Sequence, residues 1–396
     1  MTEHIKYSEH CSACGACAEI CPKKAITLRA DAEEYLKPMV DETLCVSCGA
    51  CLRVCPIEKT ERKPDVQRAF LAINTDEKLY DSSSSGGAFS ALAKYVLSLN
   101  GSVFGASLKK ENGLLICRHI EVRALSDLPA LQGSKYVRSQ TKGMFGCVKE
   151  RLLEGRTVLF SGTSCQVAAL HAYLGKKYDN LLTVDLVCHG TPETTLLSSY
   201  VQYLEKQLDS DIETLTFRRK TAPGFYSSGE SYVLALLCKD RISGKTFEKF
   251  IDKKSSAYFR MFLSQADYRP NCYACRYANP QKPADITLGD FKPSQAERER
   301  FGLDERKLYS SVFANTEKGM RYVSASPDLQ IIGETGMELM LKHHIRLKEP
   351  SAMTKDGQRL LKTYRLGGFP AVQAYISAER IVKAGPRAIR DAIRKR

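Results

Sequence analysis

A cysteine motif that occurs twice near the start constrains the fold of this chain more than any other feature. The first copy is Cys11-x2-Cys14-x2-Cys17-x3-Cys21, and the second follows 34 residues later as Cys45-x2-Cys48-x2-Cys51-x3-Cys55. In each copy a glycine follows the second cysteine and a proline follows the fourth. Such an internal repeat predicts two equivalent sites, one for each copy.

Four thiolates are the usual protein ligands of a [4Fe–4S] cluster. In two-cluster proteins one copy of the motif supplies three ligands, and the other copy supplies the fourth. We therefore predict one cluster held by Cys11, Cys14, Cys17 and Cys55. The second cluster is then held by Cys45, Cys48, Cys51 and Cys21.

The alternative for these eight cysteines is a pair of zinc sites. Zinc motifs use pairs of cysteines rather than a triplet followed by Cys-Pro, so clusters are favoured. Residues 5–57 resemble a bacterial-type two-cluster ferredoxin. This resemblance implies an α+β, ferredoxin-like N-terminal domain.

Charge separates this module from the rest of the chain. Residues 1–60 carry seven Lys and Arg against nine Asp and Glu, whereas the whole chain has a net charge of +14. The charged, proline-marked stretch 58–65 is typical of a linker. We predict a two-cluster domain at 1–60, a larger domain at 61–335, and a helical, basic C-terminal extension at 336–396.

The larger domain alternates between strand and helix patterns. Strands are expected at 102–108, 158–160, 181–187, 214–218, 232–238, 286–288 and 312–314. Helices are expected at 86–99, 166–174 and 192–208. This alternation predicts an α/β body with a mixed sheet.

Several classes of protein are disfavoured by the sequence. Apolar runs are far shorter than the roughly 18 residues of a membrane span. We also see no signal peptide. We therefore expect a cytoplasmic protein whose cysteines are reduced. The basic excess and the basic tail 383–396 are compatible with nucleic-acid binding. The tail has no aromatic residues on which bases stack, so we expect no nucleic-acid partner.

Four of the remaining seven cysteines form a second pattern. Cys165 and Cys188 each follow a predicted strand, and Cys272-x2-Cys275 forms a clip. Because the carboxyl ends of parallel strands share one crevice, these four predict a single four-thiolate site, for a cluster or for zinc. The other cysteines, Cys117, Cys147 and Cys238, are expected in the core.

Histidines and glycine-rich turns give weaker signals. We expect His343 and His344 on the surface. The turn 82–87, rich in serine and glycine, precedes a predicted helix and suits a phosphate. A second turn of small residues, at 133–136, includes the cationic side chain of Lys135. The strand at 284–291 ends at Gly-Asp, a plausible place to meet a ligand ring.

Taken in order, these segments resemble the beta-subunit family of coenzyme F420 hydrogenase/dehydrogenase. The segments that carry the resemblance are 84–89, 133–136, 161–168, 184–190, 217–220, 272–275 and 284–291. The resemblance implies FAD as a cofactor and a third [4Fe–4S] cluster on Cys165, Cys188, Cys272 and Cys275. It implies flavin contacts by Ser85, Gly86, Gly87, Gly133, Ser134, Lys135, Ser161, Gly162 and Thr163.

The sequence departs from the family at two points. Many relatives have a tryptophan where this chain has Lys292. Cys188-His189-Gly190 is typical of a bacterial branch whose members need not use coenzyme F420.

The resemblance implies an iron–sulfur flavoprotein oxidoreductase. Electrons would pass between a hydride carrier, either reduced coenzyme F420 or NAD(P)H, and FAD. They would then pass through [4Fe–4S] clusters to a redox protein or partner subunit such as ferredoxin. Arg218, Arg219, Lys220 and Lys135 are candidates for holding anionic groups, and no acid–base pair stands out. The alternative is a non-catalytic adaptor that carries clusters for another enzyme.

Overall fold

The computed structural model describes residues 4–6, 8–31, 34–57, 68–222 and 232–394. For residues 383, 384 and 386–394 it describes the backbone alone. The predicted linker, residues 58–65, lies outside the described residues. In the described part of the chain, none of the helices combines the length and apolar character that crossing a membrane requires.

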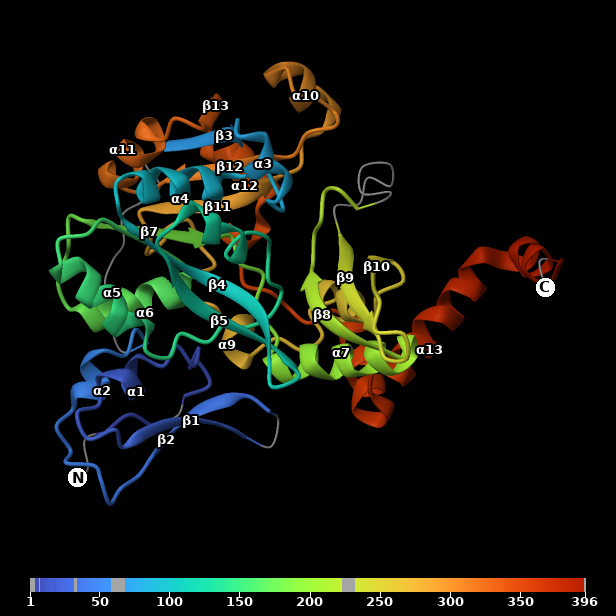
Figure 1. Cartoon of the computed structure of the whole chain (residues 1–396), viewed down its shortest axis with the longest axis horizontal. Coiled ribbons are helices and arrows are strands. Elements are labelled where there is room, and N and C mark those ends of the chain that lie inside the picture. The colour runs from blue at the N-terminus through green and yellow to red at the C-terminus, as the bar shows by residue number, and fades with distance from the viewer. Residues whose placement is uncertain (1–3, 7, 32–33, 58–67, 223–231, 395–396) are drawn as a thin grey trace.

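The N-terminal module is a small α+β unit, as the resemblance to a ferredoxin predicted. Its helices are α1 (Ala16–Ile20) and α2 (Ala50–Arg53), each of which starts inside one copy of the cysteine motif. Its strands, β1 (Ile26–Ala30) and β2 (Leu36–Val40), pair antiparallel. The module lies beneath helices α5 and α6 of the body (Figure 1).

The two copies of the motif share one loop conformation. Gly15 and Gly49, which precede α1 and α2, have φ angles of 78° and 67°. Two residues earlier, Ala13 and Ser47 have φ angles of 50° and 52°. The recurring glycine is therefore explained by a left-handed backbone position that each loop requires.

Eight strands form the main sheet, in the order β13-β3-β12-β11-β7-β6-β4-β5. Their bounds are β3 (Arg68–Asn74), β4 (Ser102–Glu111), β5 (Leu114–Val122), β6 (Val158–Ser161), β7 (Leu181–Leu186), β11 (Ile286–Phe291), β12 (Tyr309–Ala314) and β13 (Leu329–Thr335). Strands β4, β6, β7 and β11 are parallel neighbours, and the remaining pairs are antiparallel. The predicted α/β body with a mixed sheet is confirmed.

Helices cover both faces of this sheet. Leu159 of β6 faces one core with α4 (Ala88–Ser98) and α11 (Glu317–Ala325). Its neighbours Val158 and Phe160 face the opposite core, with α5 (Met144–Leu153) and α6 (Ser164–Leu174). The short elements around the sheet are α3 (Glu77–Asp81), η1 (Leu125–Ala130), α9 (Pro270–Tyr273), α10 (Gln295–Phe301), α12 (Met337–His343) and η2 (Ile345–Leu347).

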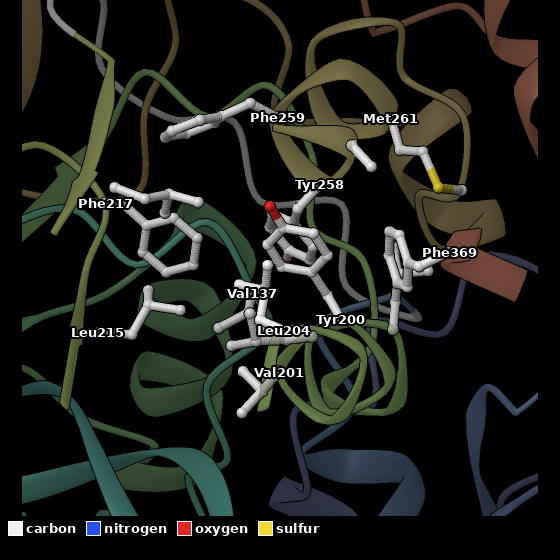
Figure 2. Close-up of a cluster of buried hydrophobic side chains, with 14 of the residues drawn as sticks. Val137, Tyr200, Val201, Leu204, Leu215, Phe217, Tyr258, Phe259, Met261 and Phe369 are labelled. Carbon is white, nitrogen blue, oxygen red and sulfur yellow. The ribbon is translucent and has the colours of Figure 1, made fainter. Parts of the chain in front are cut away.

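A second sheet, in the order β10-β9-β8, stands beside the main one (Figure 1). It consists of β8 (Ser210–Thr216), β9 (Val233–Asp240) and β10 (Thr246–Asp252). Its core also includes α7 (Thr194–Leu208), α8 (Ala257–Leu263) and α13 (Lys355–Arg394). Figure 2 shows aromatic side chains from these segments packed together, among them Tyr200, Phe217, Tyr258 and Phe369.

The predicted elements recur with shifted ends, and some strands were missed. Helix α6 begins two residues earlier than predicted, and β7 ends one residue earlier. Strands β3, β5, β10 and β13 had not been predicted. In the region predicted as an extension, Met340 packs on the main sheet and Phe369 packs on α7, so this region contributes to the body.

Candidate metal centres

The eight cysteines of the module line two separate cavities. Cys11, Cys14, Cys17 and Cys55 line a cavity of about 490 Å³, part of it open to solvent, and we call these four the inner thiol group. Cys21, Cys45, Cys48 and Cys51 line a second cavity of about 340 Å³, and we call them the outer thiol group. The structure brings together the two sets of four that the spacing predicted.

Burial sets the electrostatics of the inner thiol group. It is the main reason that the pKa of Cys14 is raised to about 12, and neighbouring Cys11, Cys165 and Cys55 contribute to the same shift. Burial also raises the pKa of Cys17, with Cys14 and Cys11 adding to the effect. Without a cation these thiols keep their protons, so a positively charged metal core is what would ionise them.

Backbone amides point at sulfur atoms in both groups. In the outer thiol group, the amide of Ile5 donates to Cys51 Sγ at 3.2 Å and that of Ala25 to Cys21 Sγ at 3.3 Å. In the inner group, the amide of Ala13 donates to Cys11 Sγ at 3.4 Å. Such donors stabilise a negative thiolate and shift the potential of a cluster that it ligates.

The body brings together a third set of cysteines, which we call the body thiol group. Cys165 lies in the first turn of α6, directly after β6, and Cys188 follows β7. Cys272 lies in α9, and Cys275 follows shortly after it. The carboxyl ends of two parallel neighbouring strands thus supply two of the four thiols, as predicted.

Electrostatic coupling shows that these four thiols are neighbours. Burial raises the pKa of Cys272 to about 12, and Cys165 and Cys275 add to the shift. Burial also raises the pKa of Cys188, with Cys272, Cys165 and Cys275 adding to it. The amide of Gly190 donates to Cys188 Sγ at 3.4 Å.

The described cysteines are too far apart to bind a single metal ion. No group of three or more His, Cys, Asp or Glu side chains in the described stretches is arranged to hold one metal ion. A cubane core separates the four thiolates that it binds, and the cysteine-lined cavities of the module leave room for such a core.

The inner and body thiol groups lie next to each other. The pKa of Cys14 is raised mainly by burial, then by Cys11, and then by Cys165 of the body. Buried Tyr277 is coupled to both groups, because its pKa is raised first by burial and then by Cys165 and Cys14. The two predicted sites therefore meet across the contact between module and body.

Body residues hold the backbone of the first cysteine loop at this contact. Thr141 Oγ1 donates to the carbonyl of Cys14 at 2.7 Å. Arg269 Nη2 donates to the carbonyls of Cys11 and Leu36, both at 3.0 Å. Arg138 donates to the carbonyl of Ala13. Sequence reasoning missed these residues, since none of them belongs to a recognisable motif.

The proposed flavin contacts lie on three turns. The first two turns are joined, because the amide of Ser134 donates to Ser84 Oγ at 2.8 Å. Ser85 Oγ donates to the carbonyl of Tyr309, the first residue of β12, at 2.9 Å. The Lys135 ammonium donates to the carbonyl of Gln132 at 2.8 Å, and burial lowers its pKa to about 8.

The third turn, Ser161–Thr163, leads from β6 into α6. Thr163 and Gln166 form a capping box there. The carbonyl of Ser161 lies 2.9 Å from His119 Nε2, and the charge of Lys135 is among the causes that lower the pKa of His119 after burial. The third turn and the Lys135 turn therefore both lie near His119.

The glycines in these turns differ in what surrounds them. A Cβ on Gly86 would lie 2.4 Å from the amide nitrogen of Ser310, and one on Gly87 would lie 2.8 Å from Asn74 Cβ. A Cβ on Gly133 would meet only Ser84 Oγ, at 3.9 Å. Close packing constrains the first two glycines, whereas Gly133 is explained by its φ of 80°, which favours glycine.

The basic run after β8 is engaged within the body. Arg218 is 3% exposed and pairs with Asp290 of β11. Lys220, also 3% exposed, donates to the carbonyls of Tyr80 and Ser85 at 2.6 and 2.5 Å. Arg219 pairs with Glu248 on the surface. Lys220 thus holds the turn that carries Ser85.

The expectation for two histidines is wrong. His344 is 6% exposed, and its Nε2 lies 2.8 Å from Ser311 Oγ of β12. His343 is half-buried, with Nε2 3.0 Å from Glu297 Oε1. The hydrophobic face of α12 brings both toward the main sheet, which the pair of histidines alone did not indicate.

The three cysteines expected in the core lie in or against it. Cys117 and Cys238 are fully buried, as predicted, and Cys147 is half-buried against the core of α5 and α6.

Comparison with known proteins gives two family matches. Residues 155–335 match the family described as the C terminus of the beta subunit of coenzyme F420 hydrogenase/dehydrogenase. Residues 10–59 match the 4Fe-4S dicluster domain. The three thiol groups fall within these ranges. The turns at 84–87 and 133–135 lie between the two ranges.

No curated protein matches the chain. Among solved structures, a chain of the F420-reducing [NiFe] hydrogenase complex from Methanosarcina barkeri is similar to this one. The two share 16% sequence identity over 78% of this chain and 96% of that chain, with a TM-score of 0.44.

Proposed function

Since this chain belongs to the coenzyme F420 hydrogenase/dehydrogenase beta-subunit family, we propose that it is an iron–sulfur flavoprotein oxidoreductase. The dicluster domain makes it a protein of iron–sulfur electron transfer. The finer proposal is a route between a hydride carrier, FAD, three [4Fe–4S] clusters and an external redox partner.

One observation carries this proposal: the inner and body thiol groups lie next to each other, because Cys14 of the module packs in the same core as Val167, two residues after Cys165 in α6. The outer thiol group adjoins the inner one, since Cys21 and Cys51 share a small core with Cys17 and Cys55, and Cys48 of the outer group is exposed. Three adjacent groups of four thiols, one of them reaching the surface, are what an electron route from a buried site to a partner requires.

The chain's own residues would bind and tune these cofactors. Each thiol group would hold one [4Fe–4S] cluster, and the amides of Ile5, Ala25, Ala13 and Gly190 would stabilise its thiolates. The residues proposed to hold FAD are Ser85, Gly86, Gly87, Gly133, Ser134, Lys135, Ser161, Gly162 and Thr163. FAD, when bound, supplies the exchange between a hydride and single electrons that the clusters need.

Two features of the body support a flavin near these turns. A Cβ on Gly133 would meet Ser84 Oγ at no less than 3.9 Å, so a ligand group could approach its backbone, and the half-buried Lys135 ammonium offers a cation to an anionic group there. Lys220 fixes the carbonyl of Ser85 and would thereby orient the turn toward a ligand.

Anaerobic purification of the full chain tests the proposal. We expect a flavin spectrum and about 12 iron atoms per chain, four for each cubane. NADH, NADPH and reduced coenzyme F420 are then tried in parallel, and the carrier that bleaches the flavin is the electron donor. Iron without any flavin would contradict the enzyme and support the adaptor, and a protein without iron would contradict both.

A further inference from the structure

A single segment, residues 138–141, touches the loops of both adjacent thiol groups. Toward the module, Arg138 donates to the carbonyl of Ala13, and Thr141 donates to that of Cys14. Toward the body, the carbonyl of Ser139 accepts a 2.9 Å bond from Gln166, the residue next to Cys165.

The same segment reaches the loop that follows Cys188. The amide of Arg138 donates to the carbonyl of Pro192 at 3.0 Å. The next residue, Glu193, is 4% exposed, and its Oε2 lies 4.0 Å from Arg138 Nη1. Glu193 also pairs with Arg269, which lies three residues before Cys272. A buried Arg138–Glu193–Arg269 triad therefore links the loops of both groups.

An unpartnered nitrogen distinguishes Arg138 within this triad. Its side chain is 6% exposed, and Nη1 has no hydrogen-bond partner among the described residues. Both Cys14 and Cys165 act electrostatically on it. A guanidinium keeps its charge under all ordinary conditions, so a permanent positive charge is buried between the two thiol groups.

We propose that Arg138 is a positioning residue that joins the two neighbouring [4Fe–4S] sites and raises the reduction potentials of both. The inference rests on the proposed function, because it requires clusters on the inner and body thiol groups. A buried positive charge stabilises the reduced, more negative state of a nearby cluster, since little solvent screens it. Glu193 opposes this effect with a buried negative charge.

The two charges predict opposite shifts in a reductive titration followed by electron paramagnetic resonance. In Arg138→Met, the reduction equilibrium of two of the three clusters shifts at least tenfold toward the oxidised state. This corresponds to a reduction potential lower by about 59 mV for one electron. Glu193→Gln, which is nearly isosteric, makes the same two easier to reduce. Arg138→Lys keeps the charge and stays near the wild type.

The outer thiol group provides an internal control, because its cluster potential stays unchanged in each variant. Arg260→Met is a matched control, since Arg260 pairs with Asp356 and Glu379 away from the cysteine loops. Unmoved potentials in Arg138→Met, or an equal shift of all three clusters, would overturn the inference. If Arg138→Met fails to retain iron, the test rests on Glu193→Gln. Unchanged or lowered reduction potentials of the inner and body clusters in that variant would overturn the inference. A wild-type protein without iron would instead contradict the proposed function.

Discussion

The guanidinium of Arg218 and the carboxylate of Asp290 form an ion pair that joins the segment after β8 to the end of β11. Burial acts to raise the pKa of Asp290, but the charge and hydrogen bond of Arg218 outweigh it and lower that pKa. The pair therefore connects the two sheets of the body beside the turn that carries Ser85.

Replacing Asp290 by Asn removes the charge opposite a buried guanidinium. We expect a loss of roughly 3 kcal/mol in the free energy of unfolding, at the low end for a broken buried pair, because the Asp290 side chain is 33% exposed. Thermal melting of the full chain measures the change. Glu334→Gln breaks the exposed pair with Arg68 and is expected to cost much less, because solvent screens that pair. Equal losses in the two variants would contradict the prediction.

Two buried histidines predict a loss of stability in acid. Burial lowers the pKa of His119 and of His344 to about 4, whereas an unfolded histidine has its ordinary value near 6.5. The unfolded chain therefore binds more protons between these values, so the free energy of unfolding falls as the pH drops from 6.5 to 4. Each histidine accounts for about 3 kcal/mol.

Melting curves at several pH values check this acid sensitivity. The loss between pH 6.5 and 4 should shrink in His344→Gln and shrink further when His119 is also replaced. His171→Gln changes an exposed histidine on α6 and should leave the pH dependence as it is. A double variant with the full acid sensitivity of the wild type would show that other groups cause it.

The cysteine loops were predictable because their information is local. The motif spacing already gave the inner and outer groups of four, and the left-handed positions at Gly15 and Gly49 follow from the recurring glycine. The body thiol group was predictable for another reason: Cys165 and Cys188 follow neighbouring parallel strands, whose ends share one edge of a sheet.

The contacts between module and body were not predictable from the sequence. Arg138, Glu193 and Arg269 are distant in sequence, and each alone looks like an ordinary charged residue. His344 was expected on the surface for the same reason, since its burial depends on Ser311 of a distant strand. Strands β8–β10 are consecutive and pair antiparallel with one another, and nothing in their own sequence marks them as a sheet separate from the main one.

Replacing Cys165 and Cys188 together by Ala tests the third cluster. We expect the iron content of the anaerobically purified chain to fall by about a third, because one of three cubanes loses two ligands. Cys238→Ala is the matched control, since Cys238 is fully buried in β9 among apolar residues and should not affect iron. Unchanged iron in the double variant would refute this assignment.

The carboxylate of Glu19 in the module caps helix α5 of the body. Its Oε1 accepts from the amide of Gly146 at 2.5 Å, and its Oε2 accepts from that of Gly143 at 3.2 Å. A negative group at a helix N-terminus satisfies free amides and interacts favourably with the helix dipole. Glu19→Ala should therefore weaken the contact by about 1 kcal/mol.

Hydrogen exchange measures this loss locally. The amides of 143–148 should exchange roughly fivefold faster in Glu19→Ala, because about 1 kcal/mol less free energy opposes opening. Glu9→Ala, at an exposed residue of the same module, should leave these amides unchanged. If Glu19→Ala exchanged at the wild-type rate, the other contacts, such as Thr141 with Cys14, would be sufficient to keep α5 closed against the module.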